Sequence, residues 1–344
     1  MQSRVAPAHQ ILNRFPRGCA LRTPVVAFVS IVATCSAAPA ISQWQPNRNI
    51  EIIAPAAAGG ALDSVSRVLQ RILQEKRLTG ASITVVNKSG GGNAVGFAYL
   101  ASHTGDAHYV AVTPLTIITN RIMGANPISY HDVTPIAMLA DEHIAFIVKP
   151  NSAIKTGRDL LERLKTDPAS VSMALAAALG NANHIAMSLV GKAVGADPKR
   201  FKIAVFNSSG ESITAVLGGH VDLAITTSGL LGPHVQAGRL AVLAVAADKR
   251  LAGPLAQVPT WKEQGVDVTF SSWRALIGPG AMTPPQVRYW EALVSKVAAQ
   301  DEWTRELDKN GLTPIYMNSD ATRRLFTQQE QQLRTILTEL GLAK

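Results

Sequence analysis

Cysteine is nearly absent from this sequence. The chain of 344 residues has two cysteines, Cys19 and Cys35, and both lie within its first 40 residues. If that segment is removed, no disulfide, zinc–thiolate site or cysteine nucleophile remains. Aromatic residues make up 5% of the chain, and its lysines and arginines are scattered. Nucleic-acid binding needs a clustered basic face, so we expect no nucleic-acid partner.

Sequence signatures of catalysis and of metal or nucleotide binding are also missing. None of the eight histidines forms a spaced pair with a carboxylate that indicates a metal site, and no Gly-x-Ser-x-Gly turn presents a serine nucleophile. The segment "SGGGNAVG" resembles a phosphate loop but lacks the Gly-Lys-Ser/Thr ending that binds phosphates. We therefore expect no catalytic residue, no metal and no cofactor.

The first 40 residues have the pattern of a secretory signal peptide. Four arginines precede an apolar run over 24–33, and small residues at 38–40 offer a cleavage site. The run is too short to span a bilayer. Cys35 suggests a lipoprotein, but the preceding Thr34 fits that signal poorly. We expect a periplasmic protein that begins near Ile41 and is mildly basic, which suits an anionic small molecule.

The rest of the chain alternates between strand-like and helical patterns. Continuous apolar runs predict strands at 49–54, 83–87, 108–113, 144–149, 171–177, 202–206, 221–226, 240–246 and 268–277. Amphipathic patterns predict helices at 61–78, 93–103, 156–166, 183–195, 210–218, 283–299, 301–310 and 319–340. This alternation favours an α/β fold with parallel sheets covered on both faces.

The length and the absence of a flexible linker indicate two α/β lobes joined by crossover strands. We expect one lobe to comprise residues 41–145 and 270–344, with the C-terminal helices, and the other to comprise 146–269. The two crossings would be "IAFIVKP" and "SWRALIGP", because each runs from one block of β/α units into the next.

Segments of small polar residues follow several predicted strands. These junctions are "AGG" at 58–60 ahead of Asp63, "NKSGGGNAVG" at 87–96, "TPLT" at 113–116, "GNAN" at 180–183 and "NSSGES" at 207–212. Ligands of open parallel sheets bind beyond the carboxyl ends of the strands, and free amides at a helix start attract anions. Each junction also has a structural explanation, as a tight turn or a helix cap. Their number, on a chain without reactive groups, predicts a receptor for a carboxylate.

Several landmarks in order carry a resemblance to a known family. They are Pro55 with Gly59, Gly60 and Asp63, then "VVNKSGGGNAVG", "VLGGHVDLAITT", "PHVQAGRLAVLAV", "VPTWKEQGVD" and "WRALIGPGAMTP". The chain resembles the extracytoplasmic substrate-binding receptors of tripartite tricarboxylate transporters, the TctC or Bug group. The resemblance implies a type II periplasmic-binding-protein fold with two lobes and two crossover strands. It also implies a small organic acid as ligand, the membrane components of a transporter or a sensor as partners, and a monomer.

The resemblance also implies a set of ligand-binding residues. In the first lobe they are Ala58, Gly59, Gly60 and Asp63, then Gly91 and Gly92, then Thr113 and Thr116. In the second lobe they are Asn181 and His184, then Ser208 and Ser209, then Thr226 and Thr227, which stand where many relatives carry an Asp-Asn pair. Further departures are Ala56-Ala57, Asn93-Ala94 and Phe206.

Arg274, where an aromatic is common in the family, completes the set. If the ligand is a di- or tricarboxylate, as we expect, Arg274 would bind its distal carboxylate beside Trp273. The alternative is that the strand turns Arg274 towards solvent or a surface acid.

Two other function classes stay open. A secreted enzyme of the hydrolase type would need a nucleophile with a base and an orienting group, and only His184 lies near the predicted cleft. A secreted structural protein would not explain glycines at the ends of strands.

Overall fold

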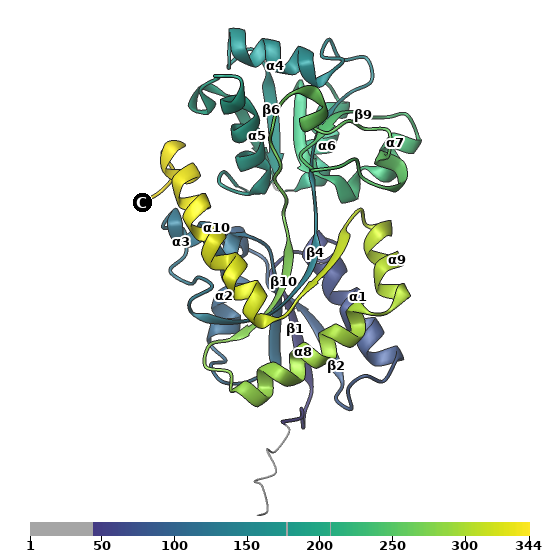
Figure 1. Ribbon diagram of the computed structural model, residues 1–344, viewed down its shortest axis with the longest axis vertical. Coiled ribbons are helices and arrows are strands. Elements are labelled where there is room, and N and C mark those ends of the chain that lie inside the picture. Colours follow the sequence, from purple (N-terminus) through teal and green to yellow (C-terminus); the bar gives the residue numbers. More distant parts are fainter. Residues whose placement is uncertain (1–43, 177, 207) are drawn as a thin grey trace, which may run out of the picture. The chain divides into compact units, whose positions relative to one another are not determined.

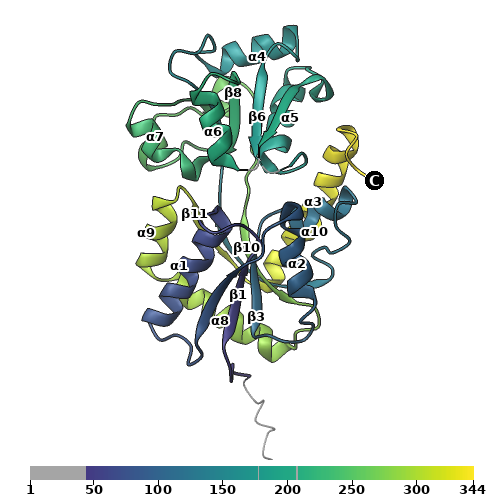
Figure 2. The same ribbon diagram turned by 180° about the vertical axis from the view of Figure 1, so that it is seen from behind.

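The computed structural model describes residues 44–176, 178–206 and 208–344. The proposed signal peptide, with Cys19 and Cys35, lies outside the described residues. The described chain forms two β-sheets with helices on both faces of each (Figures 1 and 2). Across this part of the chain, no helix combines the length and the apolar character that a membrane span requires.

The six-stranded sheet has the order β11-β4-β10-β3-β1-β2 and the five-stranded sheet the order β7-β6-β8-β5-β9. The strands are β1 Ile50–Ala54, β2 Ile83–Asn87, β3 Tyr109–Thr113, β4 Val133–Asp141, β5 Ile144–Val148, β6 Ser172–Ala176, β7 Lys202–Phe206, β8 Leu223–Thr227, β9 Ala241–Val245, β10 Arg274–Pro279 and β11 Thr313–Met317.

The α-helices are α1 Ala61–Glu75, α2 Ala94–Ala101, α3 Thr116–Ile122, α4 Gly157–Thr166, α5 Ala182–Ala193, α6 Ser209–Leu217, α7 Gly232–Gln236, α8 Pro284–Ala298, α9 Asp301–Lys309 and α10 Ser319–Glu339. Short 3-10 turns are η1 Gly91–Asn93, η2 Pro198–Arg200, η3 Ser228–Leu230, η4 Gly253–Leu255 and η5 Lys262–Gln264.

Both sheets are mixed, which corrects the expectation of parallel sheets. The ladders β2-β1-β3 and β7-β6-β8 are parallel, as predicted. In contrast, β10 is antiparallel to β3 and β4, and β5 is antiparallel to β8 and β9. The antiparallel strands β4, β5 and β10 are those that lead the chain from one sheet to the other.

Each predicted strand has a counterpart in the structure, but β4 and β11 were not predicted. Both contain a proline, Pro135 and Pro314, a residue that argues against a strand because it cannot donate to a ladder. The short helices α3 and α7 were also not predicted, whereas the eight predicted helices are present.

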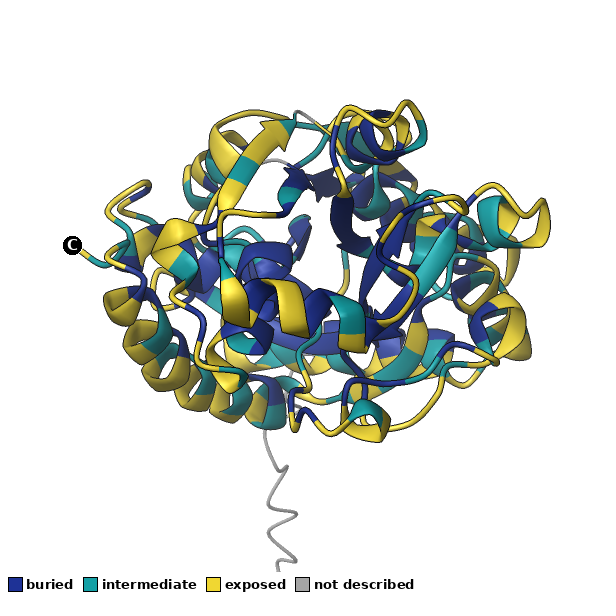
Figure 3. Cartoon of the chain, turned by 90° about the horizontal axis from the view of Figure 1, so that it is seen from above, coloured by how far each residue is buried: buried dark blue, intermediate teal, exposed yellow. Residues whose placement is uncertain are grey.

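Apolar side chains of the helices cover both faces of the six-stranded sheet. On one face, α1, α8 and α9 contribute Leu69, Trp290 and Trp303 to a buried cluster. On the other face, α2 and α10 contribute Phe97 and Phe326 to a second cluster. Figure 3 shows the strands as mostly buried and the outward sides of the helices as exposed.

Two short backbone segments connect the sheets and pair with each other. The outgoing link consists of Glu142 and His143, between β4 and β5, and the return precedes β10. His143 bridges Ser271 in antiparallel fashion, and the amide of Ser272 donates to the carbonyl of Glu142 at 2.7 Å. The lobe boundaries remain a proposal. The one after residue 145 falls within β5, whose ladders all lie in the five-stranded sheet.

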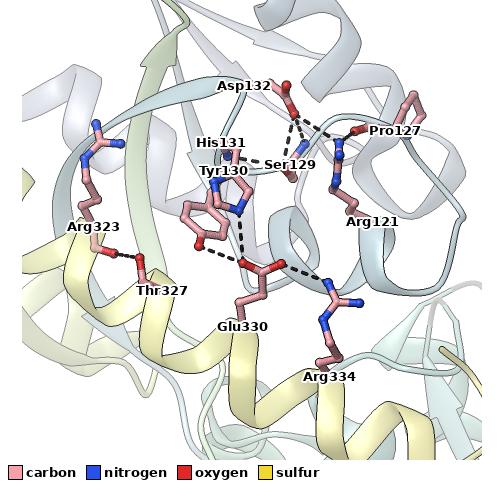
Figure 4. A network of polar contacts seen from close by, with 10 residues as sticks. All are labelled: Arg121, Pro127, Ser129, Tyr130, His131, Asp132, Arg323, Thr327, Glu330 and Arg334. Carbon is pink, nitrogen blue, oxygen red and sulfur yellow. Dashed lines mark hydrogen bonds and ion pairs between the residues drawn. The ribbon is translucent and has the colours of Figure 1, made fainter. Parts of the chain in front are cut away.

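A polar cluster fixes α10 to the segment before β4 (Figure 4). Glu330 of α10 accepts hydrogen bonds from Tyr130 at 2.9 Å and Arg334 at 3.1 Å, and its carboxylate lies 3.1 Å from the His131 ring. Burial alone would raise the pKa of Glu330, but these three partners hold it below its usual value. The carboxylate therefore stays ionised and anchors the helix.

Candidate functional site

The loop between β1 and α1 is exposed, but two of its amides bind within the protein: Gly59 donates to Asp63 Oδ2, and Gly60 donates to the carbonyl of Ala57 at 3.1 Å. Ala58 and Gly59 are exposed, and Gly59 has a φ of +79°, which favours glycine. Gly60 caps α1 without a side-chain hydrogen bond. The first amides of a helix have no intrahelical acceptor, so this helix start can bind an anion.

Asp63 holds this loop in place from the first turn of α1. Asp63 is 2% exposed, and its side chain accepts three hydrogen bonds: from the Gly59 amide at 2.8 Å, from Asn87 Nδ2 at 2.9 Å and from Arg67 Nε at 2.9 Å. Burial would raise the pKa of Asp63, but the bonds from Arg67, Gly59 and Asn87 lower it below its usual value. Asp63 is therefore ionised, and its charge is balanced by Arg67.

The loop after β2 has an unusual backbone. Gly90, Gly91, Gly92 and Asn93 have consecutive φ angles of +129°, +57°, +60° and +79°. Such angles are open to glycine and, less readily, to asparagine. Gly91 and Gly92 are exposed. Successive backbone amides in a left-handed turn can form a concave surface that binds anions.

Side chains connect this second loop to its neighbours. Asn93 donates from Nδ2 to the carbonyl of Pro55 at 2.5 Å, and its Oδ1 accepts from Thr116 Oγ1 at 2.7 Å. Asn120, which is buried, donates from Nδ2 to the carbonyl of Gly92 at 2.8 Å. The first two loops and the start of α3 are thereby held together at one edge of the sheet.

The two threonines predicted after β3, Thr113 and Thr116, lie at this edge, but their hydroxyl groups already donate hydrogen bonds within the protein. Thr113 is buried and donates to the carbonyl of Pro114 at 3.0 Å, while Thr116 donates to Asn93. Both hydroxyls therefore shape the loops in this structure, and any direct ligand contact by them stays a prediction.

In the five-stranded sheet, Asn181 and His184 shape the start of α5. Asn181 Oδ1 accepts from the His184 amide at 3.0 Å, and Asn181 Nδ2 donates to the carbonyl of Ala176 at 2.6 Å. His184 Nδ1 accepts from the Gly180 amide at 3.0 Å. Burial lowers the pKa of His184 to about 4, so the imidazole is neutral at pH 7.

The other predicted residues of this sheet lie where β7 and β8 end. Ser208 caps α6, its Oγ accepting from the Glu211 amide at 3.2 Å, and Ser209 is the first residue of that helix. Thr226 is fully buried, and its hydroxyl has no hydrogen-bond partner among the described residues. Thr227 ends β8 and is half-buried.

Arg274 is buried at the start of β10 and its guanidinium is occupied by the protein. One terminal nitrogen donates to the carbonyl of Ser272 at 3.0 Å and to its Oγ at 2.8 Å, and the other forms an ion pair with Glu142. Both side chains of the pair are almost completely buried. Trp273 stacks on Phe326 at 4.7 Å between ring centroids. Contact of Arg274 with a ligand stays a prediction, and Glu142 is the acid that holds it here.

The structure brings the first-lobe residues together through the bonds above. Loops of the two sheets also meet, because a side chain added at Gly180 would overlap with Met123 at the end of α3, and one at Gly229 would overlap with the carbonyl of Asn310.

Sequence reasoning missed the residues that organise the site, namely Arg67, Asn87, Asn93, Asn120 and Glu142. Only Asn93 gave a signal, since asparagine after three glycines is typical of a left-handed turn.

Comparison with protein families identifies the family of this chain, which the geometry alone does not. Residues 65–342 match the family described as the tripartite tricarboxylate transporter family receptor. The chain belongs to this family. A receptor binds its solute without converting it, so this family member is a binding protein and not an enzyme.

Individual relatives agree with this assignment. The receptor is 25% identical to protein BugT of Bordetella pertussis over 326 residues, which are 93% of this chain and 98% of BugT. The periplasmic binding protein BugD has the same fold, with a TM-score of 0.75, 22% identity, and coverage of 87% of this chain and 99% of BugD. Rpa4515 of R. palustris, solved with adipate, has a TM-score of 0.76 at 23% identity and covers 87% of this chain and 99% of its own. The fold is thus the two-lobed α/β fold of these binding proteins.

Proposed function

We propose that this receptor captures a small organic carboxylate outside the cytoplasm and delivers it to the membrane components of a tripartite tricarboxylate transporter. Residues 1–40 would direct its export as a cleaved signal peptide. N-terminal sequencing of the exported protein should then begin near Ile41. A sensor is the alternative destination, since the same capture step would serve both.

The observation that carries the proposal is the backbone of the Gly90–Asn93 loop beside the start of α1. Four consecutive left-handed residues and a helix start without a side-chain cap gather backbone amides at one sheet edge. Asp63 does not oppose an anion there, because Arg67 balances its charge. The related fold of Rpa4515 was solved with adipate, which supports a carboxylate as the class of ligand.

A binding screen with a matched pair of variants tests the proposal. Purified receptor is titrated calorimetrically with malate, adipate, amino acids and aromatic acids. Gly92→Val should then weaken binding of the acid found about a hundredfold or more, because about two charge-assisted hydrogen bonds of roughly 1.5–3 kcal/mol each are lost.

Gly238→Val is the control. Gly238 has a φ of +65° and open space around it, so valine there imposes similar backbone strain away from these loops. Affinity should be retained in this variant. If Gly92→Val remains folded and binds as tightly as Gly238→Val, the second loop does not hold the carboxylate.

A further inference from the structure

The three loops that follow β6, β7 and β8 of the five-stranded sheet carry no cationic side chain. Segments 177–184, 206–212 and 226–232 contain neither lysine nor arginine, and their titratable residues are His184 and Glu211. The His184 ring is buried and uses Nδ1 to accept from the Gly180 amide. These three loops therefore offer a carboxylate no positive partner.

The single arginine expected to fill that role is neutralised within the protein. Arg274, the first residue of β10, pairs with Glu142, which lies in the outgoing link between the two sheets. Its other terminal nitrogen donates to Ser272 and to the carbonyl of Trp273, the latter at 3.1 Å. A ligand carboxylate would have to displace Glu142 and leave that acid buried without a partner, which is strongly unfavourable.

Positive charge is present on the opposite side, around the loops of the six-stranded sheet. Arg67 follows the first loop, but Asp63 balances its charge, so the pair adds no net charge there. Lys88 begins the second loop, with its ammonium group 4.2 Å from the centre of the Tyr99 ring. The charge distribution is thus asymmetric: one edge attracts an anion, and the other offers caps and apolar groups such as Leu179, which is 40% exposed.

We propose that this receptor selects ligands with a single carboxylate and an uncharged far end, and that Glu142 enforces the selection by cancelling the charge of Arg274. The inference rests on the proposed function. A second carboxylate would lose its hydration opposite loops that carry no cation, whereas an amide or hydroxyl pays a much smaller desolvation penalty there. The class indicated is therefore a monocarboxylate with a polar, uncharged end, in place of the di- or tricarboxylate expected from the sequence.

Ligands matched in length test this proposal. Succinate, glutarate and adipate are each titrated against their monoamides by calorimetry at pH 7, with adipamide as the uncharged reference. We expect at least one monoamide to bind ten times or more tighter than its diacid, and adipamide not to bind. A diacid that binds as tightly as its monoamide would overturn the inference and leave the proposed function intact. Failure of all acids and monoamides to bind would overturn both.

Variants of the Glu142–Arg274 ion pair test whether this pair causes the preference for the monoamide. Glu142→Gln leaves the charge of Arg274 unbalanced, so the preference for the monoamide should fall at least tenfold. Glu330→Gln removes the same charge from the α10 cluster and should leave the preference unchanged. An unchanged preference in folded Glu142→Gln would refute the role of Glu142.

A double variant keeps the test usable if Glu142→Gln does not fold. Glu142→Gln combined with Arg274→Gln removes both charges and should keep the wild-type preference, because neither state offers a free cation. Loss of the preference in this double variant would refute the mechanism, since it would mean that the ion pair acts other than by cancelling charge.

Discussion

Replacement of Asp63 by asparagine should both destabilise the protein and weaken ligand binding. The carboxylate accepts from three donors at once, namely the Gly59 amide, Asn87 and Arg67. Asparagine has one acceptor oxygen where aspartate has two. Its NH2 group, which is itself a donor, would replace the second oxygen and point at one of these three donors. We therefore expect the free energy of unfolding to fall by about 2–4 kcal/mol, from the loss of a charge-assisted bond and at least one unsatisfied buried donor.

The pH dependence of this difference is fixed by the direction of the pKa shift. The pKa of Asp63 is lower in the folded protein than its ordinary value of 3.8. Its contribution to stability is therefore fully present above pH 3.8 and is lost as pH falls through the folded-state pKa. The stability gap between wild type and Asp63→Asn should narrow only below pH 3.8.

Urea unfolding followed by tryptophan fluorescence, repeated over a range of pH, measures the free energy of unfolding and its pH dependence for wild type and Asp63→Asn. Asp320→Asn is the matched control, because Asp320 also lies in the first turn of a helix but is exposed. Its replacement should lower stability by about 0.3–1 kcal/mol, the size of a helix-dipole effect. If both variants lose the same small amount, Asp63 is an ordinary early-helix acid and the reasoning about the first loop fails.

Two further predictions concern residues of the five-stranded sheet. His184 must gain a proton on unfolding below pH 6.5, so stability should fall between pH 6.5 and about 4, by at most about 3 kcal/mol. In urea titrations across this range His184→Phe should lack that loss and the exposed His220→Phe should keep it; equal slopes would contradict the assignment. Gly229→Ala should lower the free energy of unfolding by about 1–3 kcal/mol, because the added carbon meets the Asn310 carbonyl. Gly80→Ala, with open space around it, should stay within about 0.5 kcal/mol, and a similarly mild effect at Gly229 would mean that the loops separate easily.

The elements that sequence reasoning found are those with a local cause. The strand β1 and the helix α1 each show their pattern within a few residues, and the glycines between them mark the turn. In contrast, β4 and β11 depend on partners far along the chain, and their prolines hide them from any local pattern. A proline is tolerated in them because each pairs in an irregular ladder with register shifts.

The candidate site divides in the same way. Small residues after the predicted strands indicated which loops would bind a ligand, since a backbone can approach a ligand closely only where the side chains are small. The contacts that set their shape join distant residues, such as Asn120 with Gly92 and Asp63 with Asn87. No spacing rule predicts that Glu142 meets Arg274 across 132 positions, so the sequence alone left the direction of Arg274 open.

The charged side chains at this site are largely paired with each other, and this explains why the ligand would be bound mainly by backbone amides. Asp63 is balanced by Arg67, and Glu142 is balanced by Arg274, so these four ionised side chains form two pairs. His184 is buried as a neutral ring. What remains for a ligand is mainly the amides of the helix start and of the Gly90–Asn93 loop, whose direction is fixed by the backbone. A fixed set of dipoles binds one carboxylate well because it needs no reorganisation, and it gives a second carboxylate nothing unless the loops opposite supply their own donors.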